Sequence, residues 1–300
     1  MRITNNMVTN TILNEVQSLD SQQSTLQTQV SSGLAVTQAS DNPSAYAQIV
    51  QLEGQSDELT QYASNAQQAL NTAQSSYSAL QSLTQIYDSA SQIGTQGTDG
   101  ALGSDSTDYA SELNEVIQQA VQVANSQFDG NYLFAGTAVS QAPFTATTDS
   151  SGDITGVTYG GNSQQAAIPL SATSSVSPST SGTTNTGIAA FINQLVSLRD
   201  ALSSSDTAGA TTALSQLQSS DNVLTSAVAE NGAIQMRIGS DQTQATSSET
   251  EVTSLISSAS DADLPSTITK LNQAQLAYQA ALQTAASVMH LSILNYVQLS

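Results

Sequence analysis

The chain has 300 residues, no cysteine, a formal net charge of −20 at pH 7 and four cationic side chains: Arg2, Arg199, Arg237 and Lys270. Such an acidic surface repels phosphate backbones and anionic membranes, so neither nucleic acid nor a membrane is expected as a partner. The lack of cysteine excludes disulfides, thiolate metal sites and cysteine nucleophiles. There is no apolar signal segment and no membrane-length run, so we expect any export to proceed without a cleaved signal peptide.

The N-terminal segment is free of both Gly and Pro from Met1 to Ser32. Its apolar residues follow a heptad spacing, with Gln23 in the one polar position. This pattern predicts a helix with an apolar seam, made of Ile12, Val16, Leu19, Leu26 and Val30.

The C-terminal segment carries a matching pattern. Gln275 takes the polar position of a heptad seam made of Leu264, Ile268, Leu271, Tyr278, Leu282, Ala285 and Met289. Beyond Met289 the helix is apolar on most sides, Leu294 included, which predicts that neighbours enclose it. Both terminal segments are nearly uncharged, with Arg2, Glu15, Asp20 and Lys270 as their charged residues. We therefore expect the two helices to pair and to be buried.

A break follows the first helix in "SGLAVTQASDNPSAYA", residues 32–47. Gly33 provides a C-terminal stop, and Asn42 caps a new helix whose first residue is Pro43. A long seam then runs through a segment without Gly or Pro, residues 55–93. Glycines at 94–103 predict a turn, and an amphipathic pattern from Leu113 to Ala124 predicts a helix running back.

Residues 130–187 contain eight glycines and three of the five prolines, which predicts a small β-rich insertion. Helical periodicity resumes at Ile188 and continues towards the C-terminus. The predicted fold is mainly α: an elongated antiparallel helical rod with an inserted β-rich domain. We expect three domains: 1–40 with 264–300 as a terminal coiled coil, 41–129 with 188–263 as the rod, and 130–187 as the outer insertion.

Four stretches resemble the flagellin and hook-associated protein family of bacterial flagella: "RITNNMV" (2–8), "SSGLAVTQASDNPSAYA" (31–47), "FDGNYLFAG" (128–136) and "ENGAIQMRIG" (230–239). The first and third are most similar to the family's hook–filament junction members. The resemblance covers the ends and the helical flanks and leaves most of 137–187 uncovered. The family usually has a basic residue after Gly33, where this chain has Leu34.

The resemblance implies a non-enzymatic, extracellular structural subunit of the flagellum, exported by the type III apparatus and needed for filament attachment and motility. Its implied partners are copies of itself in a ring, the hook-side junction protein (hook-associated protein 1), flagellin, and an export chaperone that binds the C-terminal region. No cofactor or metal is implied. The expected subunit-interface residues are Ile12, Val16, Leu19, Leu26, Val30, Ile268, Leu271, Tyr278, Leu282, Met289 and Leu294.

The terminal segments are also expected to be disordered in the free monomer. Ordering a residue costs on the order of 1.5 kcal/mol, and a single seam with almost no charges recovers too little of this to stay folded alone. Residues 1–40 and 264–300 should therefore fold on assembly.

Residues that suggest chemistry have simpler explanations. His290 is a lone histidine on an apolar helix and is interpreted as a packing residue. The acidic residues Asp105, Asp108, Glu112 and Glu115 are interpreted as solvated charges near a helix start rather than as paired catalytic carboxylates. The tyrosines Tyr62, Tyr77 and Tyr87 fit the buried side of a helix better than a sugar platform.

Two other functions stay open on the sequence. Flagellin itself shares the physical pattern, and an exported acidic adhesin would use the insertion at 130–187 to recognise a host or a glycan. The Ser/Thr-rich stretches at 171–184 and 204–212 are flexible loops or glycosylated loops. An enzyme is disfavoured, since no nucleophile arrangement, metal cluster or phosphate loop stands out.

Overall fold

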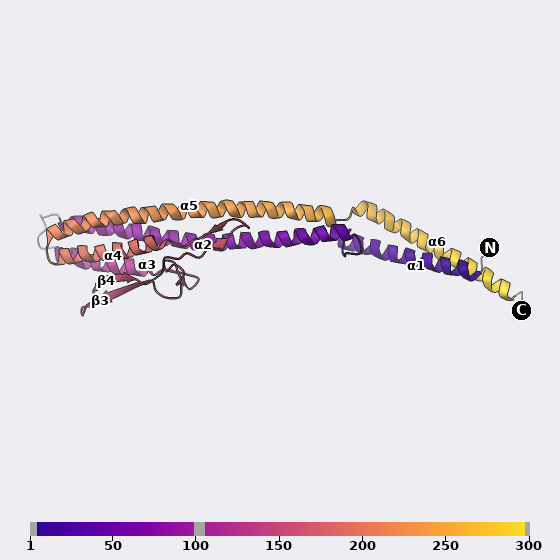
Figure 1. The fold of residues 1–300 in the computed structure, drawn as a ribbon, viewed down its shortest axis with the longest axis horizontal. Helices are drawn as coiled ribbons and strands as arrows, with labels where there is room; N and C mark the ends of the chain where they lie inside the picture. The colour runs from indigo at the N-terminus through magenta and orange to yellow at the C-terminus, as the bar shows by residue number, and fades with distance from the viewer. Residues whose placement is uncertain (1–4, 99–105, 298–300) are drawn as a thin grey trace. The chain divides into compact units, whose positions relative to one another are not determined.

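The structure, a computed structural model, describes residues 5–98 and 106–297. The chain divides into two units, residues 1–57 with 249–300 (unit 1) and residues 58–248 (unit 2). The predicted mainly α fold is confirmed, with the helices α1 (Asn5–Ser32), α2 (Pro43–Thr98), α3 (Ser106–Ala124), α4 (Gly182–Ser203), α5 (Thr207–Ser260) and α6 (Leu264–Val297) in the described part of the chain (Figure 1).

Unit 2 is built on four helices that lie side by side: most of α2, all of α3 and α4, and most of α5 (Figure 1). The long predicted seam of α2 is confirmed, because its positions from Ala66 to Leu83 are buried at heptad spacing. Its members on this stretch are Ala66, Ala69, Ala73, Ser76, Leu80 and Leu83.

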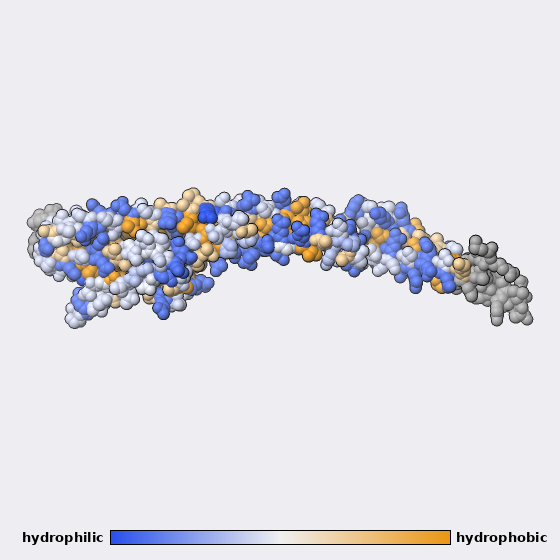
Figure 2. All heavy atoms as spheres, in the orientation of Figure 1, coloured by the Kyte–Doolittle hydropathy of each residue, from blue (hydrophilic) through white to orange (hydrophobic). Residues whose placement is uncertain are grey.

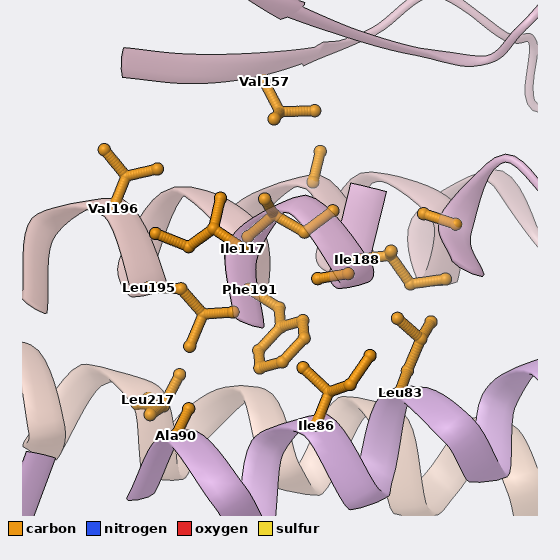
Figure 3. Close-up of a cluster of buried hydrophobic side chains, with 14 of the residues drawn as sticks. Leu83, Ile86, Ala90, Ile117, Val157, Ile188, Phe191, Leu195, Val196 and Leu217 are labelled. Atoms are coloured by element: carbon orange, nitrogen blue, oxygen red, sulfur yellow. The ribbon is translucent and has the colours of Figure 1, made fainter. Parts of the chain in front are cut away.

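The main hydrophobic core of unit 2 is centred on Phe191 of α4, which is fully buried. In Figure 3 its ring lies among side chains from α2, α3 and α5. The labelled neighbours are Leu83 and Ile86 of α2, Ile117 of α3, Ile188 and Leu195 of α4, and Leu217 of α5. A second, smaller cluster joins α2 to Ile238 of α5 through Leu170 and Val176. Both clusters lie within unit 2.

The expected β-rich segment is confirmed as three two-stranded antiparallel sheets. Their strands are β1 (Gln127–Phe128) with β2 (Asn131–Tyr132), β3 (Phe144–Thr148) with β4 (Ile154–Tyr159), and β5 (Ile168–Pro169) with β6 (Ser175–Val176). The first strand thus begins a few residues ahead of the expected boundary at 130. Tight turns explain the glycines, since Gly130 and Gly152 both have positive φ values that favour this residue.

The β3–β4 hairpin packs against α3 and α4. Its inward side chains are buried and join the main core: Phe144, Ile154 and Val157. Its outward side chains include four exposed threonines, at 145, 147, 155 and 158. This alternation is what an antiparallel sheet with one covered face requires.

Two asparagine side chains bind the backbone of this hairpin from the flanking helices. Asn193 of α4 donates from Nδ2 to the carbonyl oxygen of Val157 and accepts at Oδ1 from its N–H, both at 2.8 Å. Asn125, just after α3, makes the same pair of bonds to Phe144, at 2.9 and 3.0 Å. Each asparagine amide therefore forms hydrogen bonds with both backbone groups of one strand residue, as a neighbouring strand would. Asn125 does so for β3 and Asn193 for β4.

We predict that Asn193→Leu destabilises unit 2 by about 2–3 kcal/mol, because it leaves a buried N–H and a buried carbonyl without partners. The free energy of unfolding from chemical denaturation measures the effect. Asn222→Leu on the exposed face of α5 is the matched control and should stay within about 0.5 kcal/mol. Equal losses in the two variants would contradict the assigned role of Asn193.

A buried cation also connects the helices to the hairpin. Arg199 of α4 donates to Oδ1 of Asp200 at 2.6 Å and to Oδ1 of Asn114 at 3.1 Å. Asn114 of α3 in turn donates to a carboxylate oxygen of Asp153, next to β4, at 2.7 Å. The charge is thus matched by a carboxylate, as a buried guanidinium requires.

Unit 1 holds the antiparallel pair of α1 and α6 together with the start of α2 and the end of α5 (Figure 1). The 33–42 loop that follows α1 is bonded to the end of α5. Ala35 donates to the carbonyl oxygen of Ser260 at 2.6 Å, and Ala262 donates to that of Gly33 at 2.8 Å. The expected boundaries at 40 and 264 lie close to these two connections.

The capping predictions for this loop are confirmed. α2 begins at Pro43, and Asn42 Oδ1 accepts the N–H of Ala45 at 3.1 Å. Gly33 has φ +76°, the left-handed conformation that ends α1. A cap that the sequence analysis missed is Ser181, whose side chain accepts the N–H of Thr184, so that α4 begins at Gly182 and not near Ile188.

Candidate subunit interface

The apolar seam predicted on α1 faces α6 within the chain. Leu26 is buried, and the other four members are half-buried: Ile12, Val16, Leu19 and Val30. α6 is the helix that packs along α1, so this burial comes from the intrachain pair. The predicted pairing of the two terminal helices is therefore seen in this structure.

The seam of α6 differs from the predicted one. The positions turned towards α1 repeat at heptad spacing: Thr267, Leu271, Ala274, Tyr278, Ala281, Ala285 and Val288, all buried or half-buried. Of the residues predicted for the α6 seam, Leu271 and Tyr278 face α1, whereas Ile268 and Leu282 are both 44% exposed and lie outside the intrachain pair.

The reason is that α6 carries two adjoining apolar stripes offset by one residue, which share Leu271, Tyr278 and Ala285. The intrachain pair uses the stripe with the smaller side chains, because small residues let two helices approach closely. The second stripe is left outside the pair. We call it the outer stripe: Leu264, Ile268 and Leu282, all exposed, with the exposed Gln275 between them.

Exposed apolar side chains are concentrated in unit 1. Of the ten large ones in the described part of the chain, nine lie in unit 1 and Met236 lies in unit 2. The nine are Met7, Leu13, Tyr46, Val50, Leu255, Leu264, Ile268, Leu276 and Leu282. Figure 2 shows orange, apolar residues among blue, polar ones on the face that it draws. A unit that leaves so many large apolar side chains exposed is a candidate for interaction with other chains.

Three of the residues singled out at the C-terminus lie outside the described side chains: Met289, His290 and Leu294. Several exposed apolar residues were missed by the sequence analysis. Tyr46 and Val50 stand one helical turn apart at the start of α2, a spacing that could have shown a second interaction face. Leu13 and Leu276 are off the heptad positions and gave no such signal.

Charge is sparse on the paired helices. α1 carries Glu15 and Asp20, and Lys270 is the one Lys or Arg in the sequence of α6. An interface with so few charges can bring copies of the chain together without strong like-charge repulsion. The two helices with few charges, α1 and α6, are therefore also the helices that carry most of the exposed large apolar side chains.

Asp41 organises the loop between α1 and α2. Its Oδ2 accepts from the N–H and the hydroxyl of Thr37 at 3.0 and 2.9 Å, and from the N–H of Gln38 at 3.1 Å. These bonds, those from Thr37 first, hold the pKa of Asp41 below its ordinary value of 3.8. A lowered pKa means that the ionised carboxylate favours the folded loop, and this contribution is lost as the pH falls through the folded value.

We therefore predict that the amide protons of Thr37 and Gln38 shift together on acidification, with a midpoint below 3.8. An NMR titration of the full chain measures this midpoint. Asp41→Asn should remove the transition from both amides. A midpoint at or above the ordinary value would contradict the role of these hydrogen bonds.

The residues considered for chemistry, where the structure describes them, are solvated charges or packing residues. Glu112 and Glu115 are exposed on α3, and Asp105 lies outside the described residues. Tyr87 packs against the main core of unit 2, and burial, then the Asp221 carboxylate, raise its pKa. Within 5–98 and 106–297, His, Asp and Glu side chains form no group suited to a metal ion.

The described helices include none with the length and hydropathy to cross a membrane. A comparison with family models matches residues 3–139 to the bacterial flagellin N-terminal helical region. No curated protein sequence gives a significant match. The resemblance to the flagellin and hook-associated protein family is confirmed: the chain carries a flagellin N-terminal region and has a flagellin-like helical fold.

Solved structures similar to this one include hook-associated proteins. A Vibrio parahaemolyticus protein described as flagellar hook-associated superposes with a TM-score of 0.65 at 20% identity, covering 74% of this chain and 100% of its own. Hook-associated protein 3 of Legionella pneumophila gives 0.58 at 11% identity, covering 70% and 98%. FlgL of Bacillus cereus gives 0.57 at 16% identity, also covering 70% and 98%. The chain therefore shares the fold of these hook-associated proteins.

Proposed function

We propose that this protein is a structural subunit of the bacterial flagellum that joins hook and filament, as hook-associated protein 3 does. The observation that carries the proposal is the concentration of exposed apolar side chains in unit 1, while unit 2 buries its own in two clusters. A chain that needs neighbours to cover one of its units is suited to assembly. The flagellin N-terminal region and the likeness to hook-associated structures give that assembly its class.

The outer stripe is the proposed contact with neighbouring copies. Ile268 and Leu282 lie outside the intrachain pair and are free to pack against another chain. Burying one such side chain contributes about 1.5–3 kcal/mol. The α1 seam and the positions Leu271 and Tyr278 support this contact indirectly, because they hold the α1–α6 pair together. Met289 and Leu294 extend the proposed interface towards the C-terminus.

The free monomer is proposed to have disordered terminal segments. The α1–α6 pair buries alanines and few large side chains, so its burial offsets little of the ordering cost of about 1.5 kcal/mol per residue. Neighbouring copies would supply the missing burial. We propose three domains on this basis, with the segments that need neighbours separated from the rest. They are a terminal domain (1–40 with 264–300), a helical domain (41–129 with 188–263) and an insertion (130–187).

The proposed partners are copies of the chain in a ring, hook-associated protein 1 on the hook side, flagellin on the filament side, and an export chaperone for the C-terminal region. The proposed location is the extracellular flagellum, reached through type III export without a cleaved signal peptide. We propose no catalytic activity, because a subunit whose surfaces are used for assembly needs none.

The test is a strain that lacks this chain. It should still build hooks and should release flagellin into the medium as monomer, because filament protein has nothing to attach to. If filament protein is absent from both cell and medium, the chain is flagellin, the main alternative, and the junction proposal fails. Restoring the full-length chain should restore attached filaments, whereas a chain without residues 1–40 should not.

An exported adhesin predicts the opposite for the truncated chain. Its binding would depend on the insertion and would survive the deletion of residues 1–40. Two results together would support the adhesin and contradict the junction proposal. The truncated chain would still bind its target surface, and the strain that lacks the chain would still carry normal filaments.

A further inference from the structure

A cavity of about 570 Å³ opens in unit 2 between α2, the β1–β2 hairpin and the segment 166–179. Its size is within the range of about 300–1,000 Å³ that is usual for small-molecule sites. We propose that this cavity binds an uncharged saccharide of one or two rings. The proposal is independent of the assembly role, because the residues that line the cavity belong to unit 2.

One wall of the cavity is a polar face of α2. Ser64, Gln68 and Asn71 lie on this face at spacings of four and three residues. The side chains of Ser64 and Gln68 make no hydrogen bond to another described residue, and the amide nitrogen of Asn71 is also unused, although its Oδ1 accepts from Gln67 at 2.9 Å. This wall therefore offers hydroxyl and amide groups to a ligand rich in hydroxyls.

The aromatic lining comes from the β1–β2 hairpin. Phe128 and Tyr132 are both half-buried and both line the cavity. The turn between their strands is fixed by Asp129 and Gly130, whose φ values are +51° and +77°. A rigid aromatic surface beside amide groups suits a sugar ring, which has an apolar C–H face and a polar rim of hydroxyls.

The charge of the lining selects against other ligand classes. It contains one carboxylate, Asp129, and no Lys or Arg. Phosphates, nucleotides and sugar acids would meet a chain of net charge −20 without a cation to pair with. A single exposed carboxylate is too little to hold a metal ion. An uncharged polyol meets none of these penalties.

The experiment uses the full-length chain and saturation-transfer NMR with maltose, lactose and N,N′-diacetylchitobiose at millimolar concentration. We expect transfer to at least one of these sugars and none to glucuronate. Gln68→Ala with Asn71→Ala should weaken binding about tenfold, since each lost hydrogen bond contributes roughly 0.5–1.5 kcal/mol. The matched control is Gln74→Ala, at an exposed position of α2 outside the cavity, which should leave binding unchanged.

Alanine is a strong helix former, so these variants should keep the helical content of α2, which circular dichroism measures. The proposal is overturned if none of the three sugars shows transfer. It is also overturned if glucuronate binds equally well, or if the double variant binds the sugar as tightly as the Gln74→Ala control.

Discussion

A chain with Ile268→Glu and Leu282→Glu is expected to be exported and to leave cells without attached filaments. Both side chains are 44% exposed, so the charges are solvated in the monomer and should change its stability little. In an assembled interface they would be desolvated beside the same charges of neighbouring copies. Losing an apolar contact and burying an unpaired carboxylate together cost several kcal/mol at each position, enough to prevent assembly. Motility, and electron microscopy of a complemented deletion strain, measure the result.

The matched control is Gln273→Glu with Ala280→Glu. These positions are exposed on the other flank of α6 and add the same charge with good helix formers. The control chain should restore filaments. If the outer-stripe variant restores motility as well as the control does, the outer stripe is not a subunit contact.

The largest loss of stability is expected from Phe191→Ala. The ring is fully buried between α2, α3, α4 and α5 (Figure 3), so its removal leaves a cavity where these helices meet. Replacing a buried Phe by Ala costs about 3–5 kcal/mol. Guanidinium unfolding of the full chain, followed by circular dichroism, should show the midpoint of unit 2 moving to lower denaturant.

Met236→Ala is the control, because this side chain is 74% exposed on α5 of the same unit. Its expected change is within about 0.5 kcal/mol. A Phe191→Ala variant as stable as this control would mean that the four-helix core is not what stabilises unit 2.

Local chemistry made part of the fold predictable. The break between α1 and α2 follows from Gly33, Asn42 and Pro43, each of which acts on its own backbone or on that of near neighbours. The long seam of α2 was predictable for a similar reason, since its period is set by one helix over many turns. One of the four family motifs, residues 31–47, spans the same break between α1 and α2.

The orientation of α6 was not predictable from its sequence. The two apolar stripes share Leu271, Tyr278 and Ala285, so periodicity alone fits both. Which of the two stripes faces the partner depends on how closely α1 can approach α6. That distance is set by side chains of both helices and is not encoded in the α6 sequence alone. The sequence therefore predicted the two helices that pair, but not that Ile268 and Leu282 would lie outside the intrachain pair.

The asparagine bonds to the hairpin were also beyond sequence analysis. Asn193 and Val157 are far apart in the chain, and a half-buried asparagine in a helix has no distinctive pattern around it. The same holds for Asn125 and Phe144. The cavity beside β1 was equally hidden, because its walls come from three separate segments of the chain.

The two asparagines also affect how the hairpin can meet other molecules. A free strand edge can recruit the edge of the next molecule, and the process can continue into cross-β fibrils. Here Asn125 holds the backbone of Phe144 in β3, and Asn193 holds that of Val157 in β4. We expect these bonds to disfavour the addition of another strand at either edge of the hairpin, and Asn125→Leu with Asn193→Leu to make fibril formation easier.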